Sequence, residues 1–159
     1  ERALIMEQRA PGKGLLKVTG ILLIIGGVFC ILQSVYSSAL VSMLSIPKEE
    51  LAPNTAAIFQ EMGLTVQKAQ LSAATSSIQG ILYLVAGIFG VRNCNKIEKS
   101  QICFACGILL IIFVLFNTVI AGVISKDWSS ALLSGIAALT FPVLYFMGAL
   151  KNRQAMQGK

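Results

Sequence analysis

The sequence predicts an all-α integral membrane protein: a four-helix transmembrane bundle with short amphipathic helices in its first outer loop. The 159 residues are 55% hydrophobic and only 13% charged, whereas a soluble domain usually carries about 25% charged residues. The mean hydropathy is +0.76. Four apolar segments are each long enough to cross the roughly 30 Å hydrocarbon core of a bilayer as a helix. Residues 1–159 are therefore expected to form a single domain.

The expected helices lie near 15–42, 66–91, 101–125 and 129–150. We expect the native chain to start at Met6, so residues 1–5 carry no weight. The apolar run of the first helix is too long for a cleaved signal peptide, which predicts that this helix stays in the protein.

The connection between the first two helices is the longest polar segment. Pro47 suits the first turn of a short helix, Asn54 can cap a second one, and Gly63 can end it. We interpret this amphipathic segment as a connector on the membrane surface, because such loop helices are common in small membrane proteins. The alternative is a lid over the space between the long helices.

The remaining boundaries follow from caps and charges. Thr65 can cap the second long helix. Lys126 and Asp127 predict a tight loop between the third and fourth helices, with Trp128 at the depth of the membrane interface. Pro142 lies inside the fourth helix, where it removes a backbone hydrogen bond and predicts a kink.

Lysine and arginine set the expected orientation. Ten of them, or nine without Arg2, fall in the N-terminal segment, the 92–100 turn and the C-terminal tail, against three in the other two loops. Since cytoplasmic loops carry the excess of basic residues, both termini are expected to be cytoplasmic in a multi-pass plasma membrane protein. The net charge of +6 is explained in this way without a nucleic acid partner.

The cysteines offer only a weak case for an enzyme. Cys103 and Cys106 form a CxxC pair, which is the spacing of thiol oxidoreductases. The pair falls near the reducing cytoplasmic face, and the sequence contains no histidine. Free cysteine is also at home in membrane helices as a small hydrophobic residue. We therefore expect no catalytic residues, no metal site and no cofactor.

One polar side chain on each helix is expected at a shared depth of roughly 10–14 Å below the outer surface, at 1.5 Å rise per residue. These residues are Gln33, Gln79, Asn117 and Thr140. Because carboxamides in lipid would be unsatisfied, they should turn inward and bond one another. The layer is interpreted as a structural hydrogen-bond layer or as the floor of an outward-facing polar cavity. Three more residues would line that cavity: Ser72, Thr75 and Ser76.

Small residues at helical spacing permit close approach of helix backbones. They are Gly20, Gly27, Gly80, Gly87, Ala86, Gly90, Ala131 and Gly135. The sequence leaves open whether they pack helices within one chain or between subunits.

These features favour a small non-enzymatic membrane protein that acts by helix–helix association. Its partner would be membrane lipid, a second copy of the chain or another membrane protein. The alternative is a passive channel or facilitator for a small solute or ion. No acidic residue or histidine lies in the expected helices, so a proton-coupled carrier, which normally requires such a group, is not expected.

Overall fold

A computed structural model shows the chain as four long helices: α1 (Lys13–Leu44), α3 (Val66–Asn93), α4 (Ser100–Ser125) and α5 (Trp128–Gln157). The structure describes residues 10–47, 57–58, 61, 63, 65–96 and 99–157. All four helices are long and apolar enough to cross a membrane, which confirms the predicted all-α fold at this level. The short amphipathic helices predicted in the first loop fall largely outside the described residues.

The predicted boundaries of the first three helices agree with the structure to within two residues, whereas α5 continues to Gln157. The apolar run ends at Lys151, but the helix does not, because the next residues make tertiary contacts. Asn152 is fully buried, and the guanidinium carbon of Arg153 lies 4.4 Å from the ring centroid of Phe104 on α4.

Local hydrogen bonds explain how two of the helices begin. The backbone N–H of Lys68 donates to the Thr65 hydroxyl over 3.3 Å, as the cap prediction required. Between α4 and α5, Lys126 adopts the left-handed conformation with φ of 56°. The Asp127 carboxylate then accepts a 3.2 Å bond from the N–H of Ser130 and so caps α5. The tight loop predicted from Lys126 and Asp127 is confirmed.

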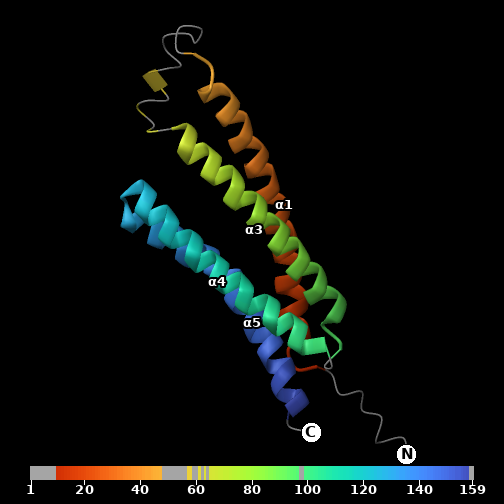
Figure 1. Cartoon of the computed structure of the whole chain (residues 1–159). Helices are drawn as coiled ribbons and strands as arrows, with labels where there is room; N and C mark the ends of the chain where they lie inside the picture. The colour runs from red at the N-terminus through yellow and green to blue at the C-terminus, as the bar shows by residue number, and fades with distance from the viewer. Residues whose placement is uncertain are drawn as a thin grey trace, which may run out of the picture.

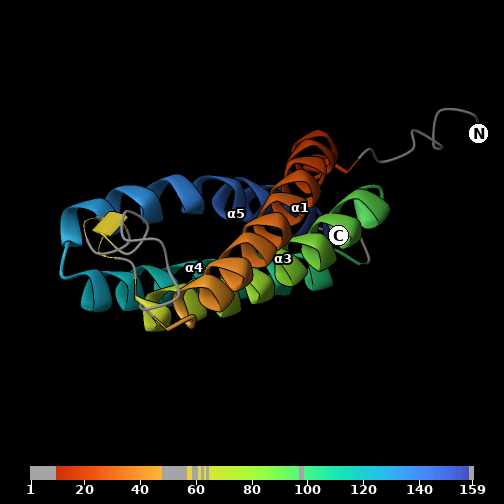
Figure 2. The same ribbon diagram turned by 90° about the horizontal axis from the view of Figure 1, so that it is seen from above.

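The helices pack as two antiparallel hairpins, α1 with α3 and α4 with α5 (Figures 1 and 2). We call the end that holds the connection 45–65 and the turn 126–127 the loop end. The terminal end holds Lys13, the turn 94–99 and Gln157. The hairpins lie close together at the terminal end and farther apart at the loop end (Figure 1).

Two pairs of glycines hold the first hairpin together by direct backbone contact. A Cβ on Gly20 would lie 3.0 Å from the carbonyl oxygen of Gly87, and a Cβ on Gly27 would lie 2.9 Å from that of Gly80. Any side chain at these positions would force the helices apart, which is why small residues are needed here. All eight small residues named above are buried inside the chain.

Asn152 joins three helices at the terminal end. Its side-chain oxygen accepts a 2.7 Å bond from the N–H of Gly12, which precedes α1, and its amide donates over 3.4 Å to the carbonyl of Cys94, which follows α3. Both partners belong to helix ends, where backbone groups lack partners within the helix. Beside this junction, a Cβ on Gly148 would lie 3.0 Å from the backbone nitrogen of Leu16. At the terminal end the backbones of α1 and α5 therefore lie close together.

A second bond between the hairpins compensates for the proline in α5. Pro142 has no N–H, so the carbonyl of Ala138, four residues earlier, has no donor within its own helix. The hydroxyl of Tyr83 on α3 donates to that carbonyl over 3.3 Å. In an apolar environment each unsatisfied backbone group is costly. Tyr83 thus stabilises both the proline-containing turn and the contact between the hairpins.

The role of Tyr83 predicts a non-additive pair of substitutions. Tyr83→Phe should lower the free energy of unfolding by about 1 kcal/mol, because it removes one buried hydrogen bond. Pro142→Ala returns a helical donor to the Ala138 carbonyl, so Tyr83→Phe should cost less in that background. The measurement is a double-mutant cycle of unfolding in detergent micelles. An equal cost of Tyr83→Phe in both backgrounds would contradict this role.

Candidate functional site

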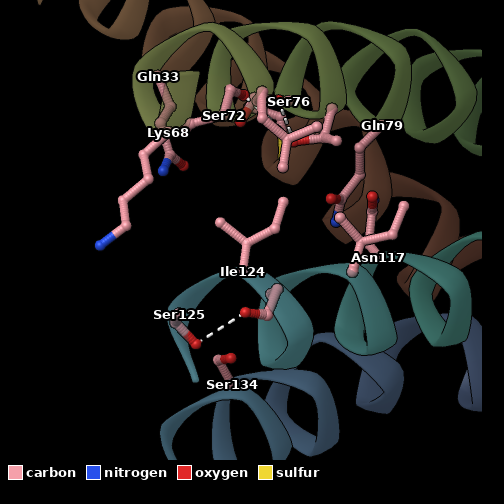
Figure 3. Close-up of a pocket in the computed structure, with 14 residues that line it drawn as sticks. Gln33, Lys68, Ser72, Ser76, Gln79, Asn117, Ile124, Ser125 and Ser134 are labelled. Carbon is pink, nitrogen blue, oxygen red and sulfur yellow. Dashed lines mark hydrogen bonds between the residues drawn. The ribbon is translucent and has the colours of Figure 1, made fainter. Parts of the chain in front are cut away.

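A cavity of about 470 Å³ opens between the hairpins at the loop end (Figure 3). Its volume falls within the range of about 300–1,000 Å³ that is typical of small-molecule sites. The lining residues come from all four helices: Cys30 and Gln33 of α1; Lys68, Leu71, Ser72, Thr75, Ser76 and Gln79 of α3; Asn117, Ile120, Ala121, Ile124 and Ser125 of α4; and Ser134 of α5.

One face of α3 forms both the cavity wall and the packed core below it. Lys68, Ser72, Ser76 and Gln79 follow one another at helical spacing and line the cavity. The next residue on this face, Tyr83, is buried and begins the packed part of the molecule. The face therefore changes from polar to apolar halfway along the helix, and the cavity ends where the change occurs.

The same change occurs on α4. Asn117, Ala121 and Ser125 line the cavity, whereas Val114 and Leu110 on the same face are buried. In Figure 3, Gln79 and Asn117 face each other at the deep end of the cavity, and Lys68 reaches out at the opposite end. The cavity therefore lies in the loop half of the molecule, above the core that packs the terminal half of the helices, and a smaller pocket of about 180 Å³ adjoins its deep end.

Most hydroxyl groups of the lining are already engaged. Thr75 donates to the Leu71 carbonyl over 2.8 Å, Ser125 to the Ala121 carbonyl over 2.7 Å, and Ser134 to the Ala131 carbonyl over 3.0 Å. Ser72 shares a 3.2 Å bond with Ser37 of α1. The hydroxyl protons of Thr75, Ser125 and Ser134 are therefore not available to an occupant of the cavity.

The other polar side chains that line the cavity make few hydrogen bonds. The side chains of Gln33, Ser76 and Asn117 make no hydrogen bond to another described residue, and the Gln79 carboxamide has only the Tyr83 hydroxyl within reach. Lys68 donates over 3.1 Å to the carbonyl of Gly63 and keeps two further hydrogens. The cavity thus presents three carboxamides, one hydroxyl and one ammonium group.

The structure brings together six of the seven residues expected in the polar layer and cavity: Gln33, Ser72, Thr75, Ser76, Gln79 and Asn117. The expected bonds among the carboxamides are not found between these described side chains. Gln79 and Asn117 are half-buried, and Gln33 is exposed. The expectation assumed a closed bundle, whereas the hairpins are farther apart at this level and leave space between the amides (Figure 3).

Thr140 does not belong to the site. It is exposed, and its hydroxyl donates to the carbonyl of Ile136 over 3.3 Å. The two-residue turn brings Gly135 against Thr118, so a Cβ on Gly135 would lie 2.5 Å from the Thr118 hydroxyl oxygen. Thr140 is therefore more than one helical turn deeper than Asn117. Ser134 takes the place that the sequence analysis assigned to Thr140.

Lys68, Cys30 and Ser134 were missed as lining residues. Lys68 was counted only as a loop charge, although it lies four residues before Ser72 and so shares its helix face. That spacing could have identified it. For Ser134 the necessary information was the contact of Gly135 with Thr118, which sets the level of α5 against α4.

The CxxC cysteines lie away from the cavity. Cys103 is fully buried, and its thiol lies 3.7 Å from the carbonyl oxygen of Phe89. Cys106 is half-buried and faces a small apolar pocket with Leu82 and Leu109. Neither residue lines the polar cavity.

The chain matches no protein-family model, no curated protein sequence and no solved structure. Its class therefore follows from its own features. Four helices of spanning length and apolarity are typical of a multi-pass membrane protein.

The arrangement of the polar side chains predicts a contrast between two double-mutant cycles. Ser34 and Ser77 form an interhelical hydrogen bond within the first hairpin, and Ser34 is buried. Replacing both by alanine should reveal a coupling of about 0.6 kcal/mol, the average for such bonds in membranes. Gln79→Leu and Asn117→Leu should instead be additive within about 0.5 kcal/mol, because no bond links them. Unfolding in detergent micelles measures both cycles, and strong coupling of Gln79 with Asn117 would mean that the deep end is closed.

Proposed function

We propose that this chain is a non-enzymatic plasma membrane protein that acts by association, and that the polar cavity is its binding site. The observation that carries the proposal is the set of free polar groups in the cavity. Three carboxamides and a hydroxyl face an open space instead of bonding one another. In a bundle whose polar residues served packing alone, such groups would find partners on neighbouring helices. These groups are therefore available to a ligand or a partner.

The proposed orientation places the loop end outside the cell. Support comes from the basic residues, since the terminal end carries Lys13, Arg92, Lys96 and Lys151 among others. The cavity then opens to the outer surface and its occupant arrives from outside. Its walls would be wetted rather than filled by acyl chains, because lipid tails cannot satisfy amide groups.

An impermeant thiol reagent tests the orientation and the wetting together. In a variant whose native cysteines are replaced by alanine, Gln79→Cys should react when the reagent is added outside sealed cells, because only a hydrated thiol ionises readily. Ile136→Cys is the matched control. The Ile136 side chain points away from the other helices, is 67% exposed, and lies near the level of Asn117. Ile136→Cys should not react. Equal reactivity of the two variants would contradict a hydrated cavity enclosed by helices whose outward surface faces lipid.

A second candidate function is passive facilitation of a small solute. The observation in its favour is the depth of the cavity, which reaches Gln79 and Asn117 near the middle of their helices. Passage would require the terminal half to open, since Leu23, Tyr83 and Tyr145 fill it. A binding protein keeps that half closed throughout.

Blocking the cavity tests the binding role. Ala121→Trp places a large side chain among the lining residues, whereas Ile112→Trp adds the same side chain at an outward position that is 61% exposed. Native mass spectrometry in a maltoside detergent should show a bound species on the wild type and on Ile112→Trp, and its loss from Ala121→Trp. Retention on both variants would contradict the cavity as the site. Glycerol flux into liposomes that is abolished only by Ala121→Trp would favour the facilitator.

A further inference from the structure

The free groups of the cavity have a distinct chemical preference, which goes beyond the existence of a binding site. Each amide group of Gln33, Gln79 and Asn117 can donate two hydrogen bonds and accept two, whereas the ammonium group of Lys68 only donates. A well-matched occupant therefore supplies an excess of acceptor oxygens near Lys68.

Charge points in the same direction. Lys68 is the only charged side chain among the described residues that line the cavity, and no carboxylate lines it. Two described carboxylates lie at the loop end: that of Asp127 caps α5, and that of Glu61 does not line the cavity. Among the described residues, an anion in the cavity would thus meet a cation and several neutral donors and no lining carboxylate.

The positions of these groups divide the cavity into two regions. Lys68 lies at the mouth, with Ser72 and Ser76 on the same face, whereas Gln79 and Asn117 lie at the deep end (Figure 3). From Ser72 to Gln79 the distance along α3 is about 10 Å at 1.5 Å per residue. The mouth offers a positive charge. The deep end offers carboxamides, which both donate and accept and so match alcohol hydroxyl groups.

We propose that the cavity binds a phosphate ester of a small hydroxylated alcohol, with the phosphate near Lys68 and the hydroxyl groups toward Gln79 and Asn117. This inference rests on the proposed binding role of the cavity. Phosphate supplies the excess of acceptor oxygens, and lysine is a frequent phosphate ligand. The same chemistry occurs in a free polyol phosphate and in the headgroup of a phospholipid such as phosphatidylglycerol, and the experiment separates these two sources.

The experiment uses the full chain in a maltoside detergent, which contains no phosphate. Glycerol 3-phosphate is titrated by calorimetry, and dioleoyl phosphatidylglycerol is compared with dioleoylglycerol by native mass spectrometry. Lys68→Gln should weaken binding of the phosphate probe by about tenfold or more, as expected for loss of a charge-assisted bond. Lys68→Arg should retain most of the binding.

The matched control is Lys126→Asn, which removes the other described lysine near the loop end. Lys126 does not line the cavity, and asparagine tolerates its φ of 56°. Binding should be unchanged in this variant. An equal loss in Lys126→Asn and Lys68→Gln would overturn the proposal, because it would show only a general attraction between a basic protein and an anion.

Each remaining outcome decides one point. Binding of glycerol 3-phosphate supports a free solute, whereas binding of the phospholipid alone supports a headgroup. Failure of both probes overturns the phosphate ester. Uncharged glycerol serves to separate this failure from failure of the proposed function. If glycerol binds with equal affinity to the wild type and Lys68→Gln, and Ala121→Trp abolishes this binding, the cavity remains a binding site and the anionic ligand is rejected.

Discussion

Direct backbone contact between α1 and α3 is the constraint on which the rest of the structure depends. Gly20 meets Gly87 and Gly27 meets Gly80 so closely that no side chain fits between the helices. This contact fixes the rotation of α3 about its own axis. Its glycine face is committed to α1, and the adjoining face, about a quarter of a turn away, carries Lys68, Ser72 and Gln79 toward the other hairpin. The location of the cavity wall is thus a consequence of glycine packing on the neighbouring face of the same helix.

Two sets of polar groups in the helices have different physical roles. One set is satisfied: serines and threonines bond to carbonyls of their own helices, and Tyr83 bonds to the carbonyl that Pro142 leaves free. The other set, at the deep end of the cavity, is formed by Gln79 and Asn117, which do not bond each other. In a low-dielectric setting unpaired polar groups are costly unless water or a ligand reaches them. The two sets adjoin, since Tyr83 lies one helical turn from Gln79.

Much of the fold could be predicted from the sequence, because length and apolarity define helices of spanning size and Thr65 and Asp127 mark two helix starts. Six residues of the cavity could also be identified from depth alone. Thr140 could not be assigned correctly, since its level depends on the contact of Gly135 with Thr118, which only the packed hairpin reveals. The role of Asn152 was missed for a different reason: an asparagine beside basic residues looks like a solvated tail, and only tertiary contact buries it. Hydropathy carries no information on which helix ends meet.

The bond between Gly12 and Asn152 spans 140 positions of the chain, and this separation has a consequence for assembly. Each hairpin pairs helices that are adjacent in sequence, so each can form early and locally. The junction at the terminal end must wait until the last turns of α5 have been synthesised. Until then the two hairpins are joined only by contacts made earlier along α5, such as the bond between Tyr83 and Ala138. Docking of Asn152 is therefore the last contact that synthesis makes possible between the ends of the chain.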